Sequence, residues 1–357
     1  MSTAVASRPA QRGTLTAGRL PRWVRPVAVV ASFPVAWLLA TLLPGDTSVG
    51  VVAAAALVVF LVSMHLISLA IEGSRRAVDR LAQHLVVSAF VLALLPLLSL
   101  VLTALGRGLQ RFDPTFFTWS MRNVLGEGGG ASHAIAGTLW VTGLATLISV
   151  PVGLLTAVYL SEYGRGALAR GITFFVDVMT GIPSIVAGLF AYALFAMLLG
   201  PGWVSGLAGS VALSVLMIPV VVRSTEELLR IVPNELREAS YALGVPKWKT
   251  ILRIVLPTAV SGIVSGVILA VARIIGETAP LMIAAGFTQS LNRTPLSGPM
   301  MTLPVFVYDS YAHPGTPADP YLARAWTGAL TLILIVMTLN LLGRLIARRF
   351  APKTAGR

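Results

Sequence analysis

The sequence predicts an all-α protein that crosses a membrane about eight times. Its mean hydropathy is +0.83 and only 11% of its residues are charged, whereas a soluble chain of this size carries roughly 25%. Several apolar runs are long enough to cross a bilayer, which takes about 20 helical residues each. These observations argue against a soluble domain built around one core.

The chain begins with a polar segment, 1–25, that is typical of a disordered cytoplasmic tail. Two apolar runs then predict an N-terminal transmembrane hairpin within 26–83. The first run lacks a convincing small-residue cleavage site and a second span follows it, so we interpret it as an uncleaved helix rather than a signal peptide. A basic C-tail, 347–357, closes the chain. The eight predicted spans cover residues 26–43, 50–71, 84–106, 132–160, 172–199, 206–222, 257–285 and 326–346.

Lysine and arginine indicate the topology. With the N-terminus inside and alternating spans, 21 of these residues fall inside and five outside, while Arg273 falls within a span. Cytoplasmic loops carry such an excess. We therefore expect both termini and the polar segment between the sixth and seventh spans to be cytoplasmic, and the net charge of +13 to reflect topology rather than binding to nucleic acid.

That polar segment has the pattern of two short helices joined by a turn. Asn234 is a predicted N-cap with Glu238 shortly after it, Gly244 suits a helix stop, and the next span is expected to begin at Pro257. We call residues 234–257 the elbow. Because it adjoins the foot of a transmembrane helix, it can pass a push from a soluble partner into the membrane; the alternative is an ordinary basic loop.

Most enzyme signatures are absent. The chain has no GxxxxGK[ST] P-loop, no GxSxG or HExxH motif, no cysteine, and four histidines without metal-ligand spacing. We expect no catalytic residue, metal or cofactor in this chain. Energy for any transport must then come from a partner subunit or an ion gradient.

Three ionisable residues fall within predicted spans: Asp177, Arg273 and Glu277. Such charges are costly in a bilayer and usually face a bundle interior or a pathway. Arg273 and Glu277 are four residues apart, so we expect them to share a helical face and to be able to pair. Arg273 is then an anion contact, half of a salt bridge that holds the bundle together, or both, with Glu277 releasing it when an anion competes.

A Gly-Ile-Pro sequence interrupts the fifth predicted span between Thr180 and Ser184. Pro183 removes a backbone hydrogen bond and bends the helix. Breaks of this kind in transporters can aim a half-helix N-terminus at an anion. Thr180 and Ser184 are therefore candidate hydroxyl contacts for an oxyanion; the alternative is a kink that only shapes packing.

The elbow resembles the coupling loop of ABC-importer permeases. Glu238 and Ala239, the glycine six residues after the glutamate (Gly244), and the Leu-Pro that ends in Pro257 match the family's pattern, and Ser240 stands where the family often has a second alanine. The resemblance implies that this loop docks into a groove of a separate ATP-hydrolysing subunit. It also implies a MetI-like permease core made of the last five or six spans.

Three further stretches, 133–164, 174–190 and 272–282, resemble a narrower family, the phosphate-importer permeases. The resemblance implies a permease domain over 84–346 with its coupling loop at 224–257, in the plasma membrane of a bacterium. The sequence Gly-Glu-Thr-Ala-Pro that begins at residue 276 is more similar to the A-type subunits than to their C-type companions. The implied partners are a PstC-type permease, a PstB-type ATPase dimer that binds the ATP, and a PstS-type phosphate-binding protein.

Other readings of the sequence stay open. The same machine can carry another oxyanion, such as molybdate or sulfate, and the chain can be the C-type companion. From a different class, a gradient-driven secondary carrier is disfavoured by the elbow and by the lack of a denser buried acid–base relay.

Overall fold

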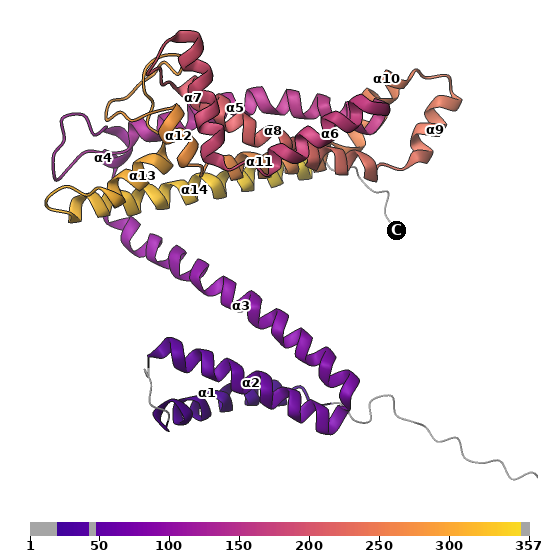
Figure 1. The fold of residues 1–357 in the computed structure, drawn as a ribbon, viewed down its shortest axis with the longest axis vertical. Helices are drawn as coiled ribbons and strands as arrows, with labels where there is room; N and C mark the ends of the chain where they lie inside the picture. The colour runs from indigo at the N-terminus through magenta and orange to yellow at the C-terminus, as the bar shows by residue number, and fades with distance from the viewer. Residues whose placement is uncertain (1–19, 43–47, 351–357) are drawn as a thin grey trace, which may run out of the picture. The chain divides into compact units, whose positions relative to one another are not determined.

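The structure, a computed structural model, describes residues 20–42 and 48–350, so the outermost parts of both predicted tails lie outside it (Figure 1). Every regular element within those ranges is a helix, which confirms the all-α class. Among the described residues, seven helices are long and apolar enough to cross a membrane, or eight if one bent pair counts as a span. The chain divides into two units, residues 1–101 and 102–357, with the boundary inside one helix.

The described part of the N-terminal unit contains α1 (Val24–Leu42), α2 (Val49–Glu72) and the first part of α3 (Ser74–Gly108). Gly73, at φ +84°, turns the chain between the last two. The carboxylate of Glu72 is 1% exposed and pairs with Arg80 at 2.5 Å. It also accepts hydrogen bonds from the backbone N–H of Leu20 at 2.7 Å and the hydroxyl of Ser68 at 2.8 Å. This network explains why α3 begins ten residues before the predicted start of the third span, since Arg80 belongs to the helix that Glu72 anchors.

Four long helices lie alongside one another in the C-terminal unit (Figure 1), namely α5 (Ser132–Val158), α8 (Gly206–Ile231), α11 (Leu256–Ile274) and α14 (Asp319–Phe350). Small residues let them approach closely, as membrane helices require when apolar surface alone gives no driving force. At Gly153 of α5, a Cβ atom would lie 2.7 Å from a methyl group of Val221 on α8. Val141, Leu213 and Met217 are fully buried between the same two helices.

Shorter elements complete this unit: η1 (Leu109–Arg111), α4 (Pro114–Thr118), the π-helical turn η2 (Tyr159–Tyr163), α6 (Gly166–Thr180), α7 (Ser184–Leu199), α9 (Asn234–Ala242), α10 (Lys247–Thr250), the π-helical turn η3 (Ile251–Val255), α12 (Ala279–Ala284) and α13 (Leu303–Ala312). The fifth predicted span is broken as expected, because α6 and α7 meet at 109°. Gly188 of α7 lies against Pro280 of α12, where a Cβ would come within 2.6 Å of the proline Cα.

The seventh predicted span, 257–285, is displaced. Helical structure runs without interruption from Lys247 to Ile274 and stops there, so Pro257 lies inside the helix rather than at its start. A proline removes one helical hydrogen bond and crowds the carbonyl four residues earlier. The wide π-helical turn η3, immediately before α11, accommodates both effects.

Arg324 precedes the eighth predicted span, 326–346, and is one of the five basic residues counted outside the membrane, but it does not lie in a loop. It lies in α14, which begins at Asp319, and its side chain is fully buried. The guanidinium donates to the carbonyl oxygens of Gly126 at 2.7 Å and Gly128 at 3.0 Å and lies 4.5 Å from the ring centre of Tyr321. Arg324 therefore holds the glycine-rich loop before α5 against α14.

Candidate functional site

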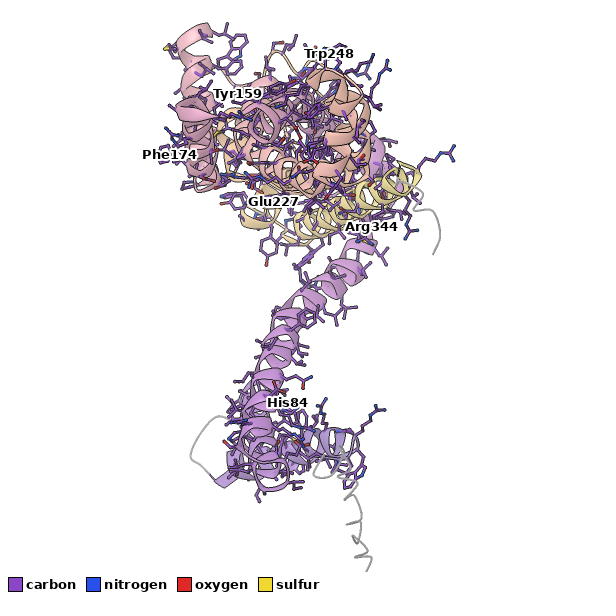
Figure 2. All side chains as sticks on the ribbon, turned by 90° about the vertical axis from the view of Figure 1, so that its right-hand side faces the viewer. His84, Tyr159, Phe174, Glu227, Trp248 and Arg344 are labelled. Carbon is purple, nitrogen blue, oxygen red and sulfur yellow. The ribbon has the colours of Figure 1, made fainter. Side chains whose placement is uncertain are left out.

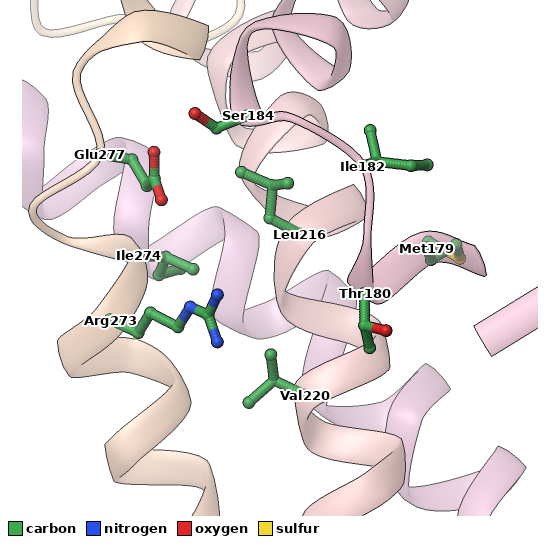
Figure 3. Close-up of a pocket in the computed structure, with 9 residues that line it drawn as sticks. All are labelled: Met179, Thr180, Ile182, Ser184, Leu216, Val220, Arg273, Ile274 and Glu277. Carbon is green, nitrogen blue, oxygen red and sulfur yellow. The ribbon is translucent and has the colours of Figure 1, made fainter. Parts of the chain in front are cut away.

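A cavity of about 240 Å³ opens where the α6–α7 break faces α8 and the end of α11. Figure 3 shows the side chains of α11 and the segment after it on one wall, with Thr180 and Ile182 across from them. The lining residues are Met179, Thr180, Ile182, Ser184, Leu216, Val220, Arg273, Ile274 and Glu277. All four residues that the sequence singled out as a substrate pathway, Arg273, Glu277, Thr180 and Ser184, thus border one space.

The predicted pairing of Arg273 with Glu277 is wrong. Helix α11 ends at Ile274, and Glu277 lies in the turn that follows, so the two residues do not share a helical face. The N–H of Glu277 donates to the carbonyl of Ile274 at 3.1 Å. Gly276 and the proline at the start of α12 end the helix before Glu277 can join it.

Both charged groups nevertheless face the cavity, with the guanidinium of Arg273 directed across it toward α8 (Figure 3). Within the described part of the chain, the side chains of Arg273 and Glu277 have no hydrogen bond and no ion pair. A guanidinium carries five donors in a fixed fork and stays charged. The cavity therefore presents an unpaired cation and an unpaired carboxylate on the same wall.

The two hydroxyl groups at the break are not equivalent. Thr180 donates its proton to the carbonyl of Asp177 at 2.6 Å, so its oxygen is left mainly as an acceptor. Ser184 is the first residue of α7, and no side chain caps that helix. The free N–H groups of a first helical turn attract negative charge. Ser184 is therefore the better placed of the two to donate to an oxyanion.

An ion-pair chain lies beside the cavity on the α6–α8 side. The carboxylate of Asp177 binds Arg223 of α8, and Arg223 also pairs with Glu226 at 3.0 Å. Glu226 in turn binds Arg230 at 2.6 Å. The sequence marked Asp177 as a costly charge but counted Arg223 only as a basic residue at a span end. Nothing local signals this pair, because 46 residues separate its members.

The elbow forms the predicted helix–turn–helix. Gly244 adopts φ +74°, the left-handed conformation that ends α9. The N–H of Val245 donates to the carbonyl of Ser240 at 3.2 Å. Ser240 is buried, and its hydroxyl is 2.8 Å from that of Thr250 in α10, which ties the two helices together. Asn234 does not act as the N-cap; Pro233 occupies that position.

The surface of the elbow is open. Glu238 and Ala239 are exposed on α9. Leu243 at the turn is 82% exposed, and Trp248, labelled in Figure 2, is 59% exposed. Exposed apolar side chains rimmed by charges are typical of a contact surface for another protein.

The elbow is fixed at Arg237 and Lys247 to η2, the π-helical turn that follows α5, by a contact that the sequence did not reveal. Arg237 donates to the carboxylate of Glu162 at 2.7 Å and to the carbonyls of Val232 at 2.7 Å and Leu229 at 3.0 Å. The side chains of Arg237 and Glu162 are 14% and 5% exposed. The ammonium of Lys247 binds the carbonyl of Glu162 as well. Since Glu162 lies 75 residues before Arg237, spacing gives no hint of the pair.

Among the described residues, no group of three or more His, Cys, Asp or Glu side chains is arranged to hold a metal ion. The polar groups around the cavity are instead one guanidinium, one carboxylate and two hydroxyls. This donor set suits a small anion that carries a proton of its own.

Comparison with known proteins gives the class of the chain. Residues 149–356 match the family described as "Binding-protein-dependent transport system inner membrane component". The chain belongs to this family, and it is a multi-pass inner-membrane protein.

Individual relatives within this family show a more specific similarity. The chain is 47% identical over 275 residues to the "Phosphate transport system permease protein PstA 1" of Mycobacterium tuberculosis (strain ATCC 25618 / H37Rv), which covers 76% of this chain and 88% of that protein. It is 38% identical to the PstA protein of Yersinia pestis, over 78% of this chain and 92% of that protein. A chain of a solved bacterial alginate ABC transporter, in complex with a pentasaccharide-bound periplasmic protein, covers 77% of this chain with 96% of its own length. Its TM-score is 0.55 at 14% identity, so it supports the fold alone.

Proposed function

We propose that this chain is one permease subunit of an ATP-driven importer of inorganic phosphate and forms half of the translocation pore. The observation that carries the proposal is the unpaired Arg273 on the cavity beside the α6–α7 break. The names of the PstA relatives support phosphate as the substrate. Arg273 is the principal contact for the anion, and Ser184 adds a donor from the start of α7.

Glu277 favours phosphate over fully ionised oxyanions. Phosphate keeps at least one proton at neutral pH, so it can donate a hydrogen bond to a carboxylate. Sulfate and molybdate carry no such proton and are repelled by a carboxylate. An unpaired Glu277 next to Arg273 thus accepts the one group that distinguishes phosphate from its competitors.

Energy for transport comes from outside the chain. We assign the elbow, with Glu238, Ala239, Ser240 and Gly244, as the surface that docks a PstB-type ATPase dimer on the cytoplasmic side, with both termini on that side. Pro257 lies in the helix that continues from the elbow into the membrane. A PstC-type permease supplies the other half of the pore, and a PstS-type protein delivers phosphate from outside. Closure of the ATPase dimer moves the elbow and opens the pore outward, and ATP hydrolysis returns it to the inward-facing state.

The test is uptake by the reconstituted complex of this chain with its three partner types in proteoliposomes. We expect ATP-dependent accumulation of labelled phosphate that a hundredfold excess of phosphate abolishes but equal excesses of sulfate or molybdate do not. Accumulation of sulfate or molybdate instead overturns the substrate assignment. Phosphate uptake by this chain alone, driven by an ion gradient, overturns the assignment as an ABC-importer subunit.

A further inference from the structure

The N-terminal unit contains an apolar cavity that the proposed transport function does not use. Its volume is about 790 Å³, and α1, α2 and α3 all line it. Phe33, Ala53 and Leu95 are typical of its walls, where the polar exceptions are Ser32, His84 and Ser88. All of these residues belong to the first compact unit.

One end of this cavity is polar and basic. Arg25 lies one helical turn before Val29, the first residue of α1 that lines the cavity. It donates to the side-chain oxygen of Gln83 at 3.5 Å, next to His84 in α3. Arg22 and Arg75 stand at the same end, where α1 and α3 begin, whereas the nearby carboxylate of Glu72 is already paired with Arg80. Positive charge is therefore in excess here.

His84 adds a polar group to the wall close to this end; Figure 2 labels it. Its side chain is only 8% exposed, and its Nε2 atom is buried with no hydrogen-bond partner among the described residues. The ring meets Phe60 edge-on with 5.3 Å between ring centres. A buried nitrogen without a hydrogen-bond partner costs stability. A ligand with a polar atom near Nε2 would remove this cost.

We propose that this cavity binds an anionic phospholipid, with one acyl chain between the three helices and its headgroup phosphate at Arg25. Basic pockets between membrane helices are the sites where anionic headgroups bind. An ester or phosphate oxygen of the lipid is the missing partner for His84. A transmembrane helix of another subunit does not fit, because it is about 10 Å across and about 30 Å long, several times the volume available. A single extended acyl chain is narrow enough.

The site can be tested by counting retained lipids. The full chain, purified with its partners, is exchanged into nanodiscs of equal phosphatidylglycerol and phosphatidylcholine, released, and analysed by native mass spectrometry. We expect one tightly retained phosphatidylglycerol. Ala53→Trp fills the cavity and should remove it, whereas Val62→Trp, on an exposed position of α2 that does not line the cavity, should not. Equal retention in both variants overturns the proposal, as does equal loss.

Arg25→Gln separates the headgroup contact from the chain contact. One arginine near a headgroup changes the binding of an anionic lipid about fivefold, so the preference for phosphatidylglycerol over phosphatidylcholine should fall by about that factor while one lipid is still retained. Arg349→Gln, at the far end of the chain in α14, is the matched control. An unchanged preference in Arg25→Gln contradicts the assigned headgroup position.

Because the chain has no cysteine, Ala53→Cys introduces the only thiol of this chain, which can be labelled with a photoactivatable group before the complex is assembled. Cross-linking to lipid supports the proposal if the native complex forms in the same sample. Cross-linking to a partner subunit shows that a protein covers the cavity and overturns it. Neither result depends on phosphate transport, so a failed transport assignment leaves this test intact.

Discussion

Two arginines of the C-terminal unit, Arg237 and Arg273, differ in whether the described residues bind their side chains. At the root of the elbow, Arg237 and Glu162 are nearly buried and fully bonded to each other and to backbone carbonyls. At the cavity, Arg273 and Glu277 lie close in sequence but have no partner among the described residues. The guanidinium of Arg237 uses its donors for hydrogen bonds within the chain. The side chains of Arg273 and Glu277 make no such bonds with the described residues, so their donors and acceptors face the cavity.

The number of hydrogen-bond donors already in use distinguishes an arginine that stabilises the fold from one that is free to bind a ligand. Sequence position cannot do so, since both arginines lie near glutamates or helix ends. The hydrogen bonds of the guanidinium do distinguish them. A guanidinium whose donors are all bonded has none left for a ligand, whereas one that faces a cavity without partners still has them. On this basis we propose that Arg237 transmits force and that Arg273 binds the anion.

The largest effect is expected for Arg273→Gln. Loss of two charge-assisted hydrogen bonds of about 1.5 kcal/mol or more each should lower phosphate uptake by about 100-fold. Co-purification should still recover the intact complex, because the Arg273 side chain makes no hydrogen bond or ion pair with the described residues. Loss of assembly in this variant would show that Arg273, like Arg237, has a structural role.

Glu162→Gln tests the saturated pair. It leaves the guanidinium of Arg237 nearly buried without its counter-charge, which costs roughly 3 kcal/mol. We expect a lower thermal unfolding temperature and ATP hydrolysis that no longer drives uptake, with the affinity for phosphate unchanged. Glu235→Gln, an exposed position in α9, is the control. Adding Arg237→Gln to Glu162→Gln should recover part of the stability, since the uncompensated charge is gone.

Gly244→Val sharpens the claim that the elbow acts through its shape. Gly244 has φ +74° and open space around its Cβ position, so the cost comes from the backbone alone, about 1–2 kcal/mol. We expect membrane insertion to persist while uptake is uncoupled from ATP hydrolysis. Gly244→Asn, which tolerates this conformation, should retain coupling. Normal uptake in the valine variant would refute the role of the turn; Glu238→Lys probes the docking surface in the same assay.

The smallest effect concerns selectivity. Glu277→Gln removes the charge that repels fully ionised oxyanions, and a hydrogen bond to a charged group is worth about 1.5 kcal/mol. Competition by sulfate should therefore strengthen about tenfold relative to wild type. If sulfate competes no better, Glu277 is not an acceptor for the phosphate proton.

The sequence predicted which residues line the cavity better than it predicted which residues they bind. Arg273 and Pro183 were identifiable because a charge or a proline inside an apolar run has few explanations. The pairing with Glu277 failed because spacing of four residues guarantees a shared face only while the helix continues, and α11 stops at Ile274. Partners such as Arg223 for Asp177 depend on which helices become neighbours, and one chain's pattern does not encode this locally.

Helix boundaries failed for a related reason. Hydropathy marks the apolar part of a helix, so it missed the polar first turns of α3 and the ten residues by which helical structure precedes Pro257. The elbow itself was predictable, since glycine and proline set its turn. Its attachment to Glu162 was not.

That attachment changes the geometry of the elbow's support. The chain joins the elbow to α8 at one end and to α11 at the other. Arg237 and Lys247 add a third connection, to the turn η2 that follows directly on α5. A segment held only at its two ends can rotate about the line that joins them. A third connection at Glu162 prevents that rotation unless the supporting helices move with the elbow. We therefore expect a displacement applied at Trp248 to reorient α5, α8 and α11 together.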